Sequence, residues 1–275
     1  MPTLRLMAVL AHPDDESLGI GGALAKYAAE GVETVLVTAT LGQRGRYRGH
    51  PRGHELHPGE PALASIREAE LRAAAAVLGV RELILLGYGD QELDRADPRE
   101  ARARIVQAIR RTRPHVVVTF GPDGAYGHPD HIAISQLTTA AVVAAADASF
   151  AADAVPVLAP HAVSKLYYMA MPETAWEAYQ AAFKQLVSVV DGVERRAVPW
   201  PQWAVTTVID THGVWEVVWR AVSCHESQVA GYAGLKGLSL EHHQAIWGRQ
   251  SFYRAFSAVN GGRNCEADLF DGLRT

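Results

Sequence analysis

The sequence predicts a doubly wound, Rossmann-like α/β fold, in which helices cover both faces of a mostly parallel sheet. Short apolar runs rich in Val, Ile and Leu alternate with longer segments whose apolar residues recur at helical spacing. The apolar runs are continuous rather than alternating, which is typical of parallel strands buried on both faces. The chain has 275 residues, of which 48% are hydrophobic, so it is long enough for one large domain.

The first half of the chain repeats a strand followed by a helix. Strands are predicted where the apolar runs lie, at residues 4–11, 32–40, 81–90 and 115–123. Helices are predicted over the amphipathic segments that follow them, at residues 16–31, 61–80, 98–114 and 128–146. A sheet of this type binds ligands at the carboxyl ends of its strands.

The second half alternates less regularly and is predicted as a C-terminal α/β extension. Strands are predicted at residues 164–171 and 204–210, and helices at residues 173–186, 213–227 and 240–256. No shift of composition marks a linker. We therefore expect a single domain over residues 1–275, in which residues 1–150 form a core with the charged motifs and residues 151–275 complete the pocket.

Composition limits the classes of partner. A net charge of -4 gives no indication of a nucleic-acid surface, and no stretch approaches the roughly 20 apolar residues that span a bilayer. Two cysteines, Cys224 and Cys265, are too few for a disulfide framework and fit a reducing compartment. We expect a cytoplasmic protein without a membrane span or a nucleic-acid partner, and the sequence leaves a homo-oligomer open.

Two charged segments follow predicted strands, and both contain His-Pro-Asp. The segment AHPDDE, residues 11–16, follows the first strand, and GPDGAYGHPDH, residues 121–131, follows the fourth. Both lie where the ligand crevice is expected. The first segment holds three consecutive acids, and each raises the cost of ionising the next unless a positive charge compensates them.

A divalent metal ion is the positive partner that these segments indicate. His12 and Asp15 can face one point, and so can Asp130 with either His128 or His131. Imidazole and carboxylate ligands suit zinc or another first-row divalent ion, and three protein ligands leave a position open for water, as in catalytic sites. A simpler alternative, in which each segment only begins a helix, explains either segment alone better than it explains the pair.

The two motifs AHPDDE and YGHPDH together resemble the LmbE-like/PIG-L family of zinc-dependent N-acetylglucosaminyl deacetylases. Three further segments match in order: REAELRAAAAVLGV, LGYGD and SCHESQ. The resemblance covers most of residues 4–250. It implies hydrolysis of the acetyl group on the nitrogen of an N-acetylglucosamine-type sugar or conjugate, giving free amine and acetate.

The resemblance also implies roles for the residues of the first motif. His12, Asp15 and His131 become the ligands of one Zn²⁺ per chain, and Asp14 becomes the general base that takes a proton from zinc-bound water. General chemistry agrees with this, because zinc lowers the pKa of bound water to about 7 and so supplies a nucleophile at neutral pH.

The second motif supplies the remaining catalytic groups in this interpretation. The resemblance makes His128 an electrophilic or acid group, oriented by Asp130, and places Tyr126 where it helps the oxyanion. Arg67 and Asp90 match positions that hold the sugar. Amide hydrolysis needs both a donor to the tetrahedral intermediate and an acid for the leaving amine.

A long basic loop follows the second predicted strand, over residues 43–60. It carries four arginines: Arg44, Arg46, Arg48 and Arg52. Loops of this length in α/β domains act as lids or binding loops, or are solvated insertions. Because a neutral sugar offers guanidinium groups little to pair with, we expect these four arginines to bind an anionic group beyond the sugar, with the loop closing over it.

Two features of the second half are less specific. His225, in SCHESQ, is predicted either to line the pocket and bind substrate or to be structural. The tryptophans are predicted as core or partner surface rather than as a sugar platform: Trp200, Trp203, Trp215 and Trp219.

Two other functions fit parts of the pattern. Two histidines and one carboxylate also describe a non-haem iron site, so Fe²⁺ and an oxidation are an alternative to hydrolysis. A non-catalytic sugar- or metal-binding protein is another. Asp14 has no ligand role in the predicted site, and its presence favours an enzyme.

Overall fold

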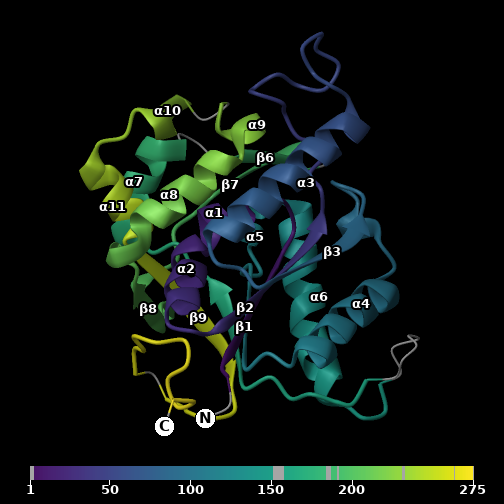
Figure 1. Ribbon diagram of the computed structural model, residues 1–275, viewed down its shortest axis with the longest axis vertical. Helices are drawn as coiled ribbons and strands as arrows, with labels where there is room; N and C mark the ends of the chain where they lie inside the picture. Colours follow the sequence, from purple (N-terminus) through teal and green to yellow (C-terminus); the bar gives the residue numbers. More distant parts are fainter. Residues whose placement is uncertain are drawn as a thin grey trace.

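The centre of the molecule is a seven-stranded sheet with the strand order β3-β2-β1-β4-β5-β9-β8 (Figure 1). This computed structural model describes residues 3–150, 158–183, 187–190, 192–230, 233–262 and 264–274. Five neighbouring strands are parallel: β1 (Arg5–Leu10), β2 (Glu33–Thr40), β3 (Glu82–Tyr88), β4 (Val116–Thr119) and β5 (Lys165–Met169). The predicted α/β fold with a mostly parallel sheet is therefore confirmed.

Continuous apolar sequence accounts for these strands. All residues from Leu6 to Leu10 in β1 are buried, and so is every residue of β4, because helices cover both faces of the sheet. The strand order reverses at β1, since β2 and β3 follow on one side of it and β4 and β5 on the other. Such a switch point opens a crevice at the carboxyl ends of β1 and β4.

Helices from both halves of the chain flank the sheet. The first half supplies α1 (Asp15–Gly19), α2 (Gly21–Ala29), α3 (Glu60–Val77), α4 (Pro98–Thr112), α5 (Gly124–Gly127) and α6 (Pro129–Ala146). The second half supplies α7 (Glu173–Phe183), α8 (Trp215–Cys224), α9 (Glu226–Val229), α10 (Ala233–Lys236) and α11 (Leu240–Trp247). Contacts join α8 to α2 and α3, and α4 to α6; in Figure 1 α2 and α8 lie on the opposite side of β1 and β2 from α4 and α6.

Several predicted helices are interrupted. The helix predicted over 16–31 breaks at Ile20, whose φ of -136° lies outside the helical region and separates α1 from α2. The helix predicted over 213–227 ends at Cys224. Of the helix predicted over 173–186, the last three residues lie outside the described residues, as does the segment 151–157 that follows the predicted core.

Two further strands extend the sheet beside β5, and one of them corrects a prediction. They are β9 (Arg249–Ser257), which is antiparallel to β5, and β8 (Thr207–Asp210), which is antiparallel to β9. The sequence predicts a helix over 240–256, but α11 ends at Trp247 and the chain enters β9. Gln250 and Phe252 are buried on one side of this strand, and the free edge of β5 supplies its hydrogen-bond partners, which helical spacing of apolar residues cannot reveal.

Smaller elements surround this sheet. The strands β6 (Val187–Val190) and β7 (Val193–Arg196) form a separate hairpin, which contacts α5. Short 3-10 turns complete the described chain: η1 (Leu93–Arg95), η2 (Gln202–Ala204) and η3 (His212–Val214). Among the described helices, none combines the length and the apolar character that crossing a membrane requires.

Candidate metal centre and pocket

The two His-Pro-Asp segments meet at the switch point of the sheet. Each turns from a buried strand toward a helix: Asp15 is the first residue of α1, and His131 lies in the first turn of α6. Since β1 and β4 are adjacent and parallel, this brings His12 and His131 together although 119 positions separate them in the chain.

Donor atoms of three residues converge there. His12 Nδ1 lies 3.1 Å from His131 Nε2, and the two Asp15 oxygens lie 3.7 Å and 3.4 Å from these nitrogens respectively. All three residues are at most 9% exposed. Phe120 stacks on the His131 ring with centroids 3.9 Å apart, which restricts the ring's orientation.

The tautomers of both rings follow from the contacts of their other nitrogens. His12 Nε2 faces carboxylate oxygens of Asp130 at 3.0 Å and Asp90 at 3.2 Å, so Nε2 carries the proton. His131 Nδ1 faces the carbonyl oxygen of Gly124 at 3.2 Å and carries its proton there. The other nitrogens of the two rings, Nδ1 of His12 and Nε2 of His131, face each other across 3.1 Å, within hydrogen-bond distance.

At this distance the two nitrogens either share a proton or bind a common cation. The charges around the site favour a cation. Burial opposes a charge on His12, yet hydrogen bonds to Asp130 and Asp90 and the nearby Asp15 raise its pKa to about 10. Burial would raise the pKa of Asp15, but His131 and His12 hold it well below its usual range. Two imidazoles and one carboxylate thus fit a divalent metal ion, with Asp130 and Asp90 supporting His12 from behind.

Other combinations of donors are also close within the described residues. Single donor atoms of His12, His128 and His131 lie within 4.8 Å of one another, as do those of His12, Asp90 and Asp130. In the second set, both carboxylates approach Nε2 of His12, which leaves Nδ1 for the other side of the ring. In the set of His12, Asp15 and His131, the two ring nitrogens are 3.1 Å apart and each lies within 3.7 Å of an Asp15 oxygen.

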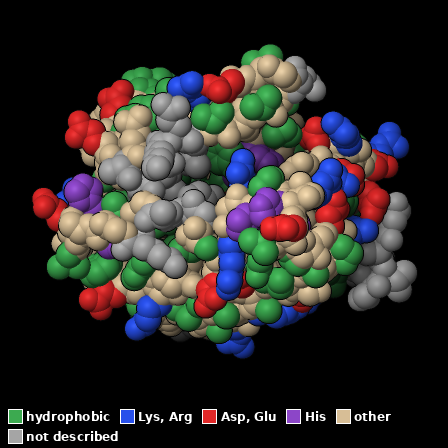
Figure 2. Space-filling view, turned by 90° about the horizontal axis from the view of Figure 1, so that it is seen from above, with side chains coloured by type: hydrophobic (Ala, Val, Ile, Leu, Met, Phe, Trp, Pro, Cys, Tyr) green, Lys and Arg blue, Asp and Glu red, His purple; other side chains and the backbone are tan. Residues whose placement is uncertain are grey.

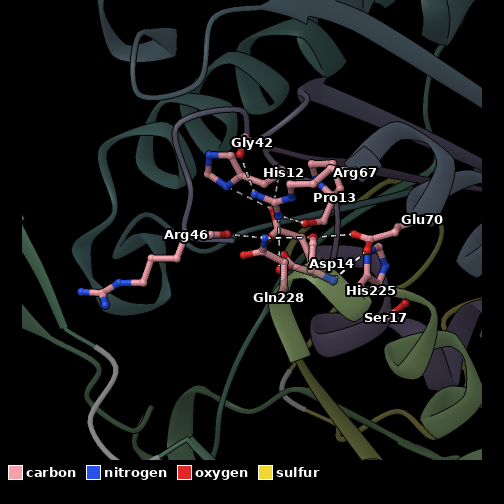
Figure 3. Close-up of polar contacts among 12 residues, drawn as sticks. His12, Pro13, Asp14, Ser17, Gly42, Arg46, Arg67, Glu70, His225 and Gln228 are labelled. Atoms are coloured by element: carbon pink, nitrogen blue, oxygen red, sulfur yellow. Dashed lines mark hydrogen bonds and ion pairs between the residues drawn. The ribbon is translucent and has the colours of Figure 1, made fainter. Parts of the chain in front are cut away.

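Asp14 lies beside this centre and has an unusual backbone. Its φ of 95° lies in the left-handed region, which is strained for a residue other than glycine. Its carboxylate is 3.3 Å from Arg67 Nη2, and Figure 3 shows the two side chains together near His12 and Pro13. Burial raises the pKa of Asp14 to about 6, against the lowering effect of Arg67, which suits a base acting near neutral pH.

His128 caps the helix α6. Its Nδ1 accepts the backbone N–H of Asp130 at 3.2 Å, so in the neutral ring Nε2 carries the proton. Burial and the neighbouring His12 and His131 lower the pKa of His128 to about 4. His128 is therefore a neutral hydrogen-bond donor in this structure.

Asp130 lies differently from the sequence prediction, in which it orients His128. Its carboxylate contacts His12 and accepts the backbone N–H groups of Gln91 and Leu93 at 2.7 Å and 3.2 Å. Only its backbone N–H reaches the His128 ring. The reason is helical geometry: His128 stands at the N-cap while the Asp130 side chain turns inward, toward β1.

Eight of the eleven predicted site residues line one pocket of about 270 Å³. They are His12, Asp14, Asp15, Arg67, Asp90, Tyr126, His128 and His131. The Tyr126 ring centre is 5.3 Å from that of His131 and 5.8 Å from that of His128, edge to face. Arg67 is 4% exposed and also donates to the carbonyl oxygens of Gly42 and Pro13.

Arg44 and His225 are not brought into the pocket. The Arg44 guanidinium pairs with Glu92 at 2.6 Å and Glu60 at 3.4 Å, while its backbone N–H donates to Asp90. His225 is 1% exposed, and its Nε2 contacts Glu16 Oε1 at 2.7 Å beneath the Asp14 turn. Of the two roles predicted for His225, the structural one fits this position, because the ring is buried at the end of α8 and does not line the pocket.

The pocket also has an apolar and aromatic part, which the sequence did not indicate. Its walls are Met169, Met171, Trp176, Tyr179, Trp200 and Ile246. Trp176 and Tyr179 project from α7 with nearly parallel rings, and Trp200 donates from Nε1 to Asp123 at 3.2 Å. Trp200, which we expected in the core or on a partner surface, is thus a pocket residue. Trp203 is 81% exposed.

A buried cluster of two imidazoles and a carboxylate, beside a second carboxylate of raised pKa, is typical of the candidate metal centres of hydrolases. Comparison with known proteins agrees. Residues 7–142 match the PIG-L family, described as GlcNAc-PI de-N-acetylase. The chain belongs to this family and is an N-deacetylase, an amide hydrolase, as predicted.

Relatives with a stated activity match this chain over almost its whole length. The chain is 39% identical to a 1D-myo-inositol 2-acetamido-2-deoxy-alpha-D-glucopyranoside deacetylase of Rhodococcus opacus, over 99% of both chains. It is 37% identical to the protein of that name from Rhodococcus jostii, again over 99% of both. Among solved structures it resembles the conserved protein TT1542 from Thermus thermophilus, with a TM-score of 0.64, 27% identity and coverage of 94% of this chain and 98% of the other.

Proposed function

We propose that the protein hydrolyses the N-acetyl group of an N-acetylglucosamine–inositol conjugate and uses a zinc ion. The observation that carries the chemistry is the convergence of His12 Nδ1, His131 Nε2 and the Asp15 carboxylate at one buried point. The substrate is supported by relatives named for it that are 37–39% identical over 99% of the chain. We assign the metal to His12, Asp15 and His131.

A bound zinc ion supplies Lewis acidity toward water and toward the amide carbonyl. Asp14, which lines the pocket beside this point, accepts the proton of the attacking water. Its pKa of about 6 leaves it ionised at neutral pH yet basic enough to accept the proton. The same carboxyl group then returns the proton to the departing amine, so that water and the amide become acetate and the free amine.

The tetrahedral intermediate carries a negative oxygen that needs donors. We assign this role to His128, whose Nε2–H is free for the pocket because its Nδ1 accepts the N–H of Asp130. Tyr126, next to His128 in the pocket wall, is placed to assist. Because His128 starts neutral, it donates a hydrogen bond without first needing a proton from solvent.

Two groups of pocket residues are proposed to recognise different parts of the substrate. Arg67 and Asp90 flank the metal centre and are proposed to bind hydroxyl groups of the sugar. The rings of Trp176, Tyr179 and Trp200 offer flat apolar surfaces for the C–H faces of the second ring of the conjugate. In this arrangement residues 151–275 complete the pocket of a single domain.

An anionic group beyond the sugar remains a prediction that the loop contacts do not favour. Within the described residues, Arg44, Arg48 and Arg52 each pair with a carboxylate, and Arg46 donates to the Gly49 carbonyl oxygen. Figure 2 shows basic and acidic side chains interspersed over one face of the molecule, with no large area of a single sign. An anionic substrate would have to displace existing partners.

The proposal also covers the identity of the metal ion and the cellular compartment of the protein. The same donor set accepts Fe²⁺, and zinc is preferred here because the chain is an N-deacetylase, which needs no redox step. We propose a cytoplasmic location, supported by the free state of Cys224 and Cys265.

The test is direct. Metal-free protein is loaded with Zn²⁺ or Fe²⁺ and incubated with the N-acetylglucosamine–inositol conjugate and with free N-acetylglucosamine, and free amine and acetate are measured. We expect equal amounts of both products and a higher kcat/KM for the conjugate. Absence of acetate with either metal would refute the proposed reaction, and equal kcat/KM for the two sugars would refute the proposed substrate.

A further inference from the structure

Asp14 is held in a backbone conformation that it would not adopt alone. At φ 95° and ψ -26° it is left-handed, and such residues persist only where their surroundings fix them. Its carbonyl oxygen accepts the N–H groups of Ser17 and Leu18, at 3.1 Å and 2.9 Å, in the first turn of α1. This fixes the C-terminal side of the residue.

The N-terminal side is fixed by a buried carboxylate. Asp14 donates its backbone N–H to Glu16 Oε2 at 3.0 Å. The other oxygen of Glu16 accepts from the Ser17 hydroxyl and faces His225 Nε2 at 2.7 Å. Glu16 is fully buried and does not line the pocket, so it touches neither substrate nor metal directly.

A buried carboxylate is costly unless a partner compensates it, and His225 is that partner. It comes from the turn after α8, 209 positions along the chain from Glu16, and the pair is 0% and 1% exposed. Figure 3 shows Asp14 between Arg67 on one side and His225 on the other. The catalytic assignments leave this pair unused.

We infer that Glu16 and His225 are positioning residues for Asp14. Their ion pair fixes the carboxylate that accepts the Asp14 N–H, and this contact keeps residue 14 left-handed, with its side chain directed to the metal centre. The inference rests on the proposed function, because it requires Asp14 as the base. It also gives the segment SCHESQ, far along the chain, a role in the reaction.

Three variants test this inference. Glu16→Gln removes the charge with little change of shape, His225→Ala removes its partner, and His225→Gln restores a donor toward Glu16. We expect the first two to lower kcat by on the order of 10- to 100-fold, since small misplacement of a catalytic group has effects of this size. KM and metal content should stay within about twofold of wild type, and His225→Gln should recover most of kcat.

A double-mutant cycle separates positioning from general damage. If Glu16 acts only through Asp14, Glu16→Gln should cost nothing further in an Asp14→Asn background. An equal loss of kcat in both backgrounds, or a loss explained by lower metal content, would overturn the inference. Full turnover of metal-loaded Asp14→Asn would instead refute the proposed base, so the two failures are distinguishable.

A matched control is the second buried ion pair, far from the pocket. Lys165 Nζ and Glu266 Oε1 are 2.6 Å apart and almost fully buried. Glu266→Gln should lower Tm without changing kcat, which measures the effect of losing a buried pair alone. A crystal structure of Glu16→Gln adds a readout other than activity: residue 14 should leave the left-handed region, and an unchanged φ would contradict the inference.

Discussion

At the scale of single residues, the hydrogen bond made by one nitrogen of each imidazole determines which nitrogen is left to bind a metal ion. Asp130 accepts the Nε2–H of His12 and the Gly124 carbonyl oxygen accepts the Nδ1–H of His131, which leaves Nδ1 of His12 and Nε2 of His131 on the side of Asp15. A metal ligand held in this way keeps its tautomer and its orientation and becomes more basic. Loss of the hydrogen bond to the other ring nitrogen should therefore lower the affinity for the metal ion although the proposed ligands themselves are unchanged.

Asp130→Asn tests this directly. We expect the dissociation constant for Zn²⁺ to rise by about 10- to 100-fold, because the variant weakens the support of His12. Competition with a chelator of known affinity measures the change, and Asp147→Asn, at an exposed carboxylate, is the matched control. A fall in kcat with unchanged affinity would show instead that Asp130 acts on His128.

Asp14→Asn should keep the bound metal while kcat falls by roughly 10²- to 10⁴-fold, since the amide keeps the shape and loses the basicity. In the wild type, Asp14 must be ionised to act, and its pKa is about 6. We therefore expect kcat/KM to fall as the pH drops through about 6 and this acidic limb to vanish in the variant. The pH profile of both proteins at constant metal occupancy is the measurement, and a limb that persists in Asp14→Asn would assign it to another group.

The convergence of the two His-Pro-Asp segments was predictable from the sequence, but the direction of each carboxylate was not. Continuous apolar strands and two His-Pro-Asp segments were enough to bring His12 and His131 to one edge of the sheet. Which neighbour a carboxylate faces depends on tertiary contacts, so the pairing of Asp130 with His12 and of Glu16 with His225 had no sequence signal.

At the scale of secondary-structure elements, β9 shows where periodicity fails. Residues 249–257 carry apolar and aromatic side chains that fit helical spacing as well as strand alternation. The antiparallel edges of β5 and β8 decide the outcome, because both leave backbone groups that only a strand between them can pair. A short apolar segment without an internal Gly or Pro does not show that the neighbouring strands need a hydrogen-bond partner.

Two phenylalanines of β9 provide a matched pair for measuring this element. Phe252 is fully buried against the core, whereas Phe256 is 46% exposed. Phe252→Ala should lower the free energy of unfolding by about 3–5 kcal/mol, through lost burial and the cavity that remains. Phe256→Ala should cost far less, and urea unfolding of both variants gives the comparison. Equal losses would mean that Phe252 does not anchor the strand to the core.

At the scale of the whole molecule, one buried carboxylate connects distant parts of the chain. Glu266 contacts Lys165 and Tyr167 of β5, Thr207 of β8 and Arg254 of β9, all at 2.6–2.8 Å. Through Glu266, the C-terminal segment thus contacts the strands β5, β8 and β9. Replacement by Gln leaves two buried cations without their carboxylate, which should cost about 3–5 kcal/mol at neutral pH.

The pH dependence of this contribution has a definite sign. Burial would raise the pKa of Glu266, but Lys165 and its other donors lower it to about 2, below the ordinary 4.5. The ionised group therefore stabilises the fold fully above about pH 4.5, and the contribution is lost as the pH falls from there toward 2. The difference in unfolding free energy between wild type and Glu266→Gln should be constant from about pH 7 to 5 and smaller at about pH 3.5. A constant difference at all pH values would show that Glu266 is not ionised in the folded protein.

The two groups of residues that line the pocket come from different parts of the polypeptide. The proposed metal ligands and catalytic groups lie within residues 12–131, inside the segment 7–142 that matches the family, whereas the aromatic wall comes from residues 169–200 and α11 beyond it. None of these wall residues is among His12, Asp15 and His131, and Trp200 reaches the second motif segment through its hydrogen bond to Asp123. The architecture is therefore modular for protein engineering: grafting α7 and the segment around Trp200 from another member of the family should exchange the preferred conjugate while the bond that is cut stays the same.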